Sequence, residues 1–88
     1  MIIMICRNKV ADYTKWRKVF DAHKDNHIRA GLHLQNVWQE LDDPDNVFFT
    51  FEVEDREKAL AYINDPVSAK AGEESGVIEG EFHFVKSI

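Results

Sequence analysis

The sequence predicts an α+β fold of the ferredoxin-like type, a βαββαβ sandwich in which helices cover one face of a four-stranded antiparallel sheet. Two segments, at residues 2–6 and 47–54, are apolar on both faces, as central strands are. A tight turn in "DDPDN" joins the second and third expected strands, and the other two connections carry helical patterns. In this topology the strands lie in the order 4-1-3-2, which puts both apolar strands in the middle of the sheet.

The first half of the chain is predicted to form a strand, a helix and a second strand. The continuously apolar "IIMIC" predicts a strand at residues 2–6. Asp12 is a suitable N-cap for a helix that we expect to run to about Ala30, because Gly31 suits the position after a helix end. From Leu32 to Leu41, the pattern "LHLQNVWQEL" mixes polar and apolar residues at period two, which predicts an edge or half-exposed strand.

The second half repeats this order. "VFFTFEVE" is rich in β-branched and aromatic residues and predicts the third strand. Asp55 is an N-cap candidate for a short helix that ends before Pro66. Asp65 and Pro66 then suit the N-cap and first position of a further helical segment, which Gly76 closes. The last strand is expected in "EGEFHFVKSI".

The register of the expected hairpin decides which side chains face the helices. A two-residue turn pairs Trp38 with Phe51, whereas a three-residue loop with a left-handed Asn46 pairs Trp38 with Glu52. A slip of one residue reverses the two faces of a strand. Trp38, Phe49 and Phe51 therefore line the space under the helices only if the register turns them that way.

The uncovered face of the sheet predicts a dimer. Right-handed crossovers put the helices on one side, and side chains such as Phe48 must lie on one side or the other. A chain of 88 residues cannot cover both faces. We therefore expect a second copy to pack sheet against sheet, giving a symmetric homodimer with a mostly apolar, obligate interface.

Composition excludes several classes of partner and cofactor. Lys and Arg number 11 against 16 Asp and Glu, a formal charge of −5, so neither nucleic acid nor an anionic membrane is an expected partner. The length fits a single domain over residues 1–88. "MIIMIC" lacks the flanks of a signal peptide, and we expect a cytoplasmic protein. Cys6 is the single cysteine, so neither a disulfide within the chain nor a thiolate metal cluster is expected.

The stretch "WRKVFDAHKDNH" places two histidines on the apolar side of the first expected helix. At about 100° per residue, His23 and His27 share a narrow arc with Trp16 and Phe20. The pair could act as acid and base, since imidazole titrates near neutrality, or could be hydrogen-bonded core groups. Metal binding would need a third ligand, and "HKDNH" lacks the glutamate of a zincin motif. We expect no metal here.

Aromatic residues surround this pair. Tyr13 shares the stripe with Trp16 and Phe20, and rings at helical spacing can form core, pocket wall or both. An aromatic cavity with a few polar tips suits a flat, hydrophobic small molecule. His33 and His83 are expected at the surface or at an interface.

Three segments, "DYTKWRKVFDAH", "DDPDNVFFTFEVED" and "KALAYINDP", resemble small bacterial proteins of the antibiotic-biosynthesis-monooxygenase-like, dimeric α+β barrel superfamily, some labelled cyclase-like. The resemblance covers nearly the whole chain and implies a homodimer with one cavity per subunit between the first helix and the sheet. Within the superfamily are cofactor-free monooxygenases on aromatic substrates, haem-degrading enzymes, muconolactone-type isomerases and polyketide cyclases. Residues 55–78 contain no histidine, which speaks against the haem-degrading branch, whose iron ligand lies on the second helical segment.

The resulting prediction is a homodimeric small-molecule enzyme of the cofactor-independent monooxygenase or cyclase type, acting on an aromatic or polyketide-like compound. His23 is the catalytic candidate, because the matching motif extends to it, whereas His27 lies near the helix end, where a cation is favoured. The ligand-binding candidates are Tyr13, Trp16, Phe20, His27, Trp38, Phe49 and Phe51. The alternative is a non-catalytic small-ligand-binding or structural dimer in which the histidines are satisfied core groups.

Overall fold

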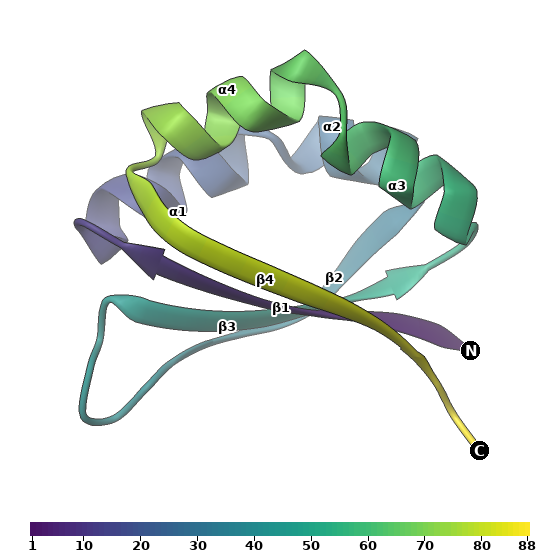
Figure 1. Ribbon diagram of the computed structural model, residues 1–88, viewed down its shortest axis with the longest axis horizontal. Coiled ribbons are helices and arrows are strands. Elements are labelled where there is room, and N and C mark those ends of the chain that lie inside the picture. Colours follow the sequence, from purple (N-terminus) through teal and green to yellow (C-terminus); the bar gives the residue numbers. More distant parts are fainter.

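The computed structural model describes residues 1–88 and confirms the predicted fold class (Figure 1). The strands are β1 (Ile2–Val10), β2 (Leu32–Gln39), β3 (Asn46–Val53) and β4 (Val77–Lys86). The helices are α1 (Tyr13–Ala22), α2 (Lys24–Arg29), α3 (Arg56–Ile63) and α4 (Pro66–Glu74). The antiparallel sheet has the order β2-β3-β1-β4, as predicted, and all the helices lie on one face of it (Figure 1).

Aspartate caps start the helices where the sequence predicts. The carboxylates of Asp12, Asp55 and Asp65 each accept a hydrogen bond from a backbone N–H two residues on, at 2.9, 2.9 and 2.8 Å. Such caps are worth about 1 kcal/mol each. Gly31 and Gly76 follow the last helix of each crossover with φ of 73° and 79°, a backbone conformation that residues with a Cβ rarely adopt.

The first predicted helix is broken, which the pattern did not foresee. His23 has φ −94° and ψ 10°, and its N–H donates to the carbonyl of Phe20 at 3.1 Å, a tighter turn than that of an α-helix. The chain then resumes as α2, with the N–H of His27 donating to the carbonyl of His23 at 3.0 Å. His23 therefore stands at the corner between two short helices.

The hairpin loop is longer than either predicted turn, so both predicted registers are wrong. Trp38 pairs with Phe48, and no residue other than glycine has a positive φ. The Asp43 carboxylate holds the loop in place by accepting from the N–H of Asp45 at 3.3 Å and pairing with the Lys9 ammonium. A loop anchored to the neighbouring strand in this way does not need a tight turn.

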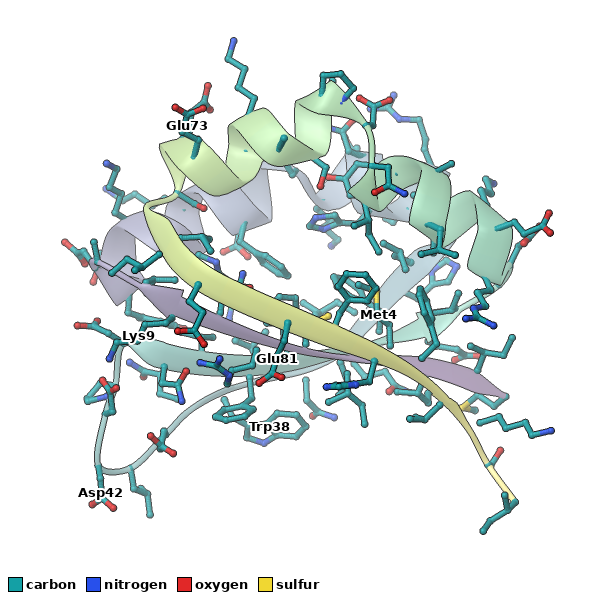
Figure 2. The ribbon with its side chains drawn as sticks, viewed as in Figure 1. Met4, Lys9, Trp38, Asp42, Glu73 and Glu81 are labelled. Carbon is teal, nitrogen blue, oxygen red and sulfur yellow. The ribbon has the colours of Figure 1, made fainter.

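The buried core lies between the sheet and the helices. Inward side chains of β1 and β3 alternate with outward ones, and Figure 2 shows Met4 on the helix side of the sheet and Trp38 on the other side. Trp16 is the largest fully buried side chain, with 1% of its surface exposed, and its ring stacks on Phe20 with centroids 4.6 Å apart. The core residues are Met4, Cys6, Val10, Trp16, Ala30, Leu32, Val47, Phe49, Phe51, Val53 and Ala59.

The opposite face of the sheet is covered by no part of this chain. Ile5, Trp38 and Val85 lie on it with 40%, 50% and 41% of their surface exposed. His33 and His83 also lie on this face and are exposed, beside Glu54 and Glu81 respectively. No helix is long and apolar enough to cross a membrane.

β1 continues four residues beyond its predicted end. In this added segment, polar side-chain contacts to the neighbouring strands take the place of apolar packing. The guanidinium of Arg7 donates to Glu81 at 2.6 Å, to Glu79 at 2.5 Å and to the amide oxygen of Asn46 at 2.9 Å. These three partners come from both neighbouring strands, β3 and β4, so Arg7 ties the middle of the sheet together on its uncovered face. A search for apolar runs cannot detect such a segment.

Candidate active site

A cavity of about 240 Å³ lies between the sheet and the helices. Its floor is formed by β1, β3 and β4, and its walls by all four helices. A cavity of about 150 Å³ is known to hold benzene, so this space fits a substituted ring or a small fused pair of rings. Most of the lining residues are hydrophobic, as in sites for flat organic ligands.

Three phenylalanines form the aromatic wall. The ring of Phe20 lies 5.2 Å from that of Phe49, and Phe49 meets Phe51 at a right angle with centroids 5.7 Å apart. Edge-to-face geometry is favourable between aromatic rings. The wall therefore brings together residues from α1 and β3.

Two of the predicted ligand-binding residues lie outside the cavity. Tyr13 packs against the outer side of Trp16, with ring centroids 6.0 Å apart, and does not line the cavity. Trp38 lies on the uncovered face, so the expectation that it adds to the wall is wrong. The cause is the hairpin register, which puts Trp38 opposite Phe48 rather than opposite Phe51.

Asn8 holds the indole of Trp16 and supplies a polar group at the cavity floor. With its amide oxygen turned toward the indole, Asn8 accepts a hydrogen bond from Trp16 Nε1 at 3.3 Å and donates to the carbonyl of Arg7 at 3.0 Å. A buried indole N–H needs such a partner. Gly80 on β4 makes room for it, because a Cβ there would lie 2.9 Å from the Asn8 amide.

His27 is enclosed by aromatic rings. Its imidazole lies 5.0 Å from the ring of Phe20, 5.3 Å from Phe51 and 5.7 Å from Tyr62, and it makes no side-chain hydrogen bond within the protein. Burial lowers the pKa of His27 from 6.5 to about 4, and the nearby His23 lowers it further in the same direction. The ring of His27 is therefore neutral at pH 7, even though a helix end favours a cation.

His23 lines the same cavity but has a hydrogen-bond partner. Its Nδ1 lies 2.9 Å from the side-chain nitrogen of Asn26 on the following helix. The two histidines thus differ: the protein satisfies one nitrogen of His23, whereas it leaves both nitrogens of His27 free. A bound molecule could therefore meet two imidazoles with different hydrogen-bonding capacities.

Several lining residues were not predicted. Tyr62 of α3 and Phe82 of β4 line the cavity, as does Asn8. On α4 and its C-cap, small residues at the spacing i, i+3, i+4, i+7 line the cavity: Ser68, Ala71, Gly72 and the C-cap Ser75. That spacing marks one face of a helix, so this face could have been found in the sequence. Likewise, Asn8 falls at an inward position of β1, two residues after Cys6.

The cavity also contains a thiol, which is unreactive. Burial raises the pKa of Cys6 to about 12, so the sulfur stays protonated and is a poor nucleophile. No group of three or more His, Cys, Asp or Glu side chains is arranged to hold a metal ion. Besides Cys6, the titratable residues that line the cavity are His23, His27, Glu81 and Tyr62, and burial raises the pKa of the Tyr62 hydroxyl.

No protein-family model and no curated protein sequence matches this chain. Its fold, in contrast, matches many solved structures. A crystal structure from Bordetella bronchiseptica, described as a candidate antibiotic biosynthesis monooxygenase, matches with a TM-score of 0.79 and 12% identity, over 99% of this chain and 96% of that one. Another structure, described as an antibiotic biosynthesis monooxygenase, matches with a TM-score of 0.72 and 12% identity, over 100% and 99% of the two chains.

The same fold also occurs under a different description. An uncharacterized NIPSNAP domain protein from Burkholderia xenovorans matches with a TM-score of 0.69 and 13% identity, over 100% of this chain and 95% of that one. At these identities the likeness establishes the fold, and the predicted resemblance is confirmed to that extent. The activity has to be argued from the cavity itself.

Proposed function

We propose that this protein is a small-molecule enzyme of the cofactor-independent monooxygenase or cyclase type, acting on an aromatic or polyketide-like compound. One observation carries the proposal: an aromatic cavity of about 240 Å³ is lined by a half-buried imidazole, His27, that makes no side-chain hydrogen bond to the protein. Both ring nitrogens of His27 are therefore available for hydrogen bonds to a ligand in the cavity. The fold shared with proteins described as antibiotic biosynthesis monooxygenases also supports it.

The roles of the residues follow from their positions. The ring of the substrate lies against Phe20, Phe49 and Phe51, and a phenolic or enolic oxygen meets the histidines. Both reaction types begin with the movement of a proton from such a substrate, which makes it electron-rich. His23, the catalytic candidate from the sequence, orients that proton together with His27.

The two reaction types differ in what happens to oxygen. In a monooxygenation with O₂, a ring CH₂ group becomes C=O: one oxygen atom enters the substrate, and the two hydrogens leave with the other oxygen as water. In a cyclisation, a carbon–carbon bond forms and protons move, but no oxidant is consumed. Oxygen uptake therefore separates the two.

The proposal includes a homodimer formed through the uncovered face of the sheet. Ile5, Trp38 and Val85 expose a large part of their apolar surface there. Exposed apolar patches on a sheet favour association, and a two-fold axis would let the same patch meet itself. No cofactor is proposed, because the substrate itself supplies the electrons for O₂.

The test is oxygen consumption and product analysis over a panel of quinol-type and polyketide-like compounds. We expect turnover by the wild-type protein that is reduced at least about a hundredfold in His23→Leu and His27→Leu, the lower end of the range that a positioned acid or base contributes. Absence of turnover and of cyclised product across the panel would count against an enzyme. A ligand retained through purification would then favour the alternative, a binding module.

A further inference from the structure

Two residues outside the predicted site, Asn26 and Arg29, link His23 to the surface through side-chain contacts. The side chain of Asn26 has two contacts: its oxygen accepts from the guanidinium of Arg29 at 2.6 Å, and its nitrogen lies 2.9 Å from Nδ1 of His23. All three residues belong to the corner that follows α1, within seven positions of the chain. They form a chain of side chains from the exposed Arg29 to the cavity.

The guanidinium of Arg29 determines which group donates and which accepts in both of these contacts. A guanidinium carries only donors, so the amide group of Asn26 must turn its oxygen toward Arg29. The NH₂ of Asn26 then faces His23, and Nδ1 of His23 must be the acceptor. A neutral imidazole that accepts at Nδ1 carries its proton on Nε2. In the opposite orientation, the NH₂ group of Asn26 would face the guanidinium of Arg29, and two donors would meet. The assignment therefore does not depend on where hydrogens are drawn.

We propose that Asn26 and Arg29 are positioning residues that hold His23 as the Nε2–H tautomer, so that the cavity presents a fixed N–H donor and selects ligands with an acceptor oxygen. Such an oxygen is a carbonyl, a phenolate or an enolate. The part about the ligand rests on the proposed function, whereas the tautomer does not. Nε2 is the nitrogen left free for a ligand, since Asn26 occupies Nδ1.

His27 complements this donor. The protein gives neither of its nitrogens a side-chain partner, so His27 can accept a hydrogen bond from a ligand hydroxyl at one nitrogen. A ligand whose hydroxyl loses its proton gains negative charge on oxygen, and a preorganised N–H donor stabilises that charge. His27 can accept a hydrogen bond, and His23 donates one from Nε2. The pair therefore suits a compound that carries both a hydroxyl and a carbonyl oxygen.

The tautomer is tested by nitrogen-15 NMR of the imidazole rings at a pH about two units above the ordinary histidine pKa, where they are neutral. In the wild-type protein we expect His23 to show a protonated Nε2 and an unprotonated Nδ1. In Asn26→Asp, the carboxylate can only accept, so the proton of His23 moves to Nδ1. Arg29→Gln, which can turn its own amide either way, leaves His23 as a mixture. The exposed His33 and His83 serve as internal controls.

A protonated Nδ1 on His23 in the wild type would overturn the proposal, and so would an unchanged tautomer in Asn26→Asp. The wild-type spectrum decides alone if a variant fails to fold. The ligand part is tested with 2-hydroxy-1,4-naphthoquinone against naphthalene by calorimetric titration. We expect Asn26→Asp to weaken the quinone about tenfold, the loss of one hydrogen bond, and to leave naphthalene unchanged. If neither probe binds while the tautomer is as expected, the proposed function and ligand selection fail and the positioning role stands.

Discussion

The two faces of the sheet are built from the same strands but carry opposite kinds of chemistry. On the helix-covered face, inward residues such as Met4 and Phe51 are apolar, and polar groups such as His27 are half-buried among them. On the uncovered face, Ile5 and Trp38 are exposed beside the ion pairs of Arg7. Alternation at period two lets each strand serve both faces.

The two faces therefore place their histidines in different surroundings. On the uncovered face, the His83 side chain is exposed to water and lies 3.5 Å from the carboxylate of Glu81. On the covered face, burial lowers the pKa of His27 to about 4, so that its imidazole stays neutral at mildly acidic pH as well. We infer that the covered face carries the site and the uncovered face the contact with a second copy.

Trp16→Ala is expected to cause the largest loss of stability, because it removes a central side chain between the helices and the sheet. Removing this fully buried ring leaves a cavity beside Phe20 and deprives Asn8 of its donor, at a cost of about 3–5 kcal/mol. Urea unfolding measures it. Tyr13→Ala is the matched control, because Tyr13 is only half-buried and packs outside the cavity. Equal losses in the two variants would contradict the account.

The next effect concerns the uncovered face. Trp38→Glu should convert a dimer to a monomer, since a central aromatic residue of an interface contributes about 2 kcal/mol or more. Val67→Glu is the control: Val67 is as exposed as Trp38, at 50%, but lies on α4, away from this face. Mass measurement by light scattering distinguishes them. A wild-type protein that is monomeric at every concentration would remove the dimer from the proposal.

The third effect is a pH dependence of stability due to His27. Its pKa is about 4 in the folded protein and 6.5 when exposed, so between these values the unfolded chain binds a proton that the folded protein does not. Stability is therefore complete above pH 6.5 and falls as the pH drops toward 4, by about 1–2 kcal/mol once solvent screening is allowed for. His27→Leu should flatten this slope, as followed by unfolding at several pH values. A slope unchanged in the variant would mean that another group causes it.

The smallest effect is expected at Gly72, inside α4. An added Cβ there would meet no atom within 4 Å, and alanine favours a helix over glycine. Gly72→Ala should therefore raise the free energy of unfolding by about 0.5–1 kcal/mol, measured in urea. A loss of stability would show that the space beside Gly72 is not free.

The sequence predicted those features that depend on a few neighbouring residues. Helix starts could be predicted from local hydrogen bonding by the caps Asp12, Asp55 and Asp65. The turns after the helices could be predicted from Gly31 and Gly76. The placement of His23 and His27 on the same side as Trp16 and Phe20 was also predicted from helical spacing. These signals do not depend on the rest of the fold.

Features set by distant residues escaped the sequence. The hairpin register depends on Lys9, which anchors the loop through Asp43 from another strand. The charge of His27 depends on Phe51 and Tyr62, which reach it from β3 and α3. The break at His23 escaped for another reason: histidine fits a helix and a corner equally well, so spacing alone shows a continuous helix.

The most direct test of the central claim fills the cavity without disturbing the fold. Gly72→Leu adds a side chain to the cavity wall, while Gly72→Ala adds only a methyl group at the same position. Binding of 2-hydroxy-1,4-naphthoquinone, followed by calorimetric titration, is predicted to persist in the wild type and in Gly72→Ala and to be lost in Gly72→Leu. Equal binding in all three proteins would show that the ligand does not enter this cavity and would contradict the account.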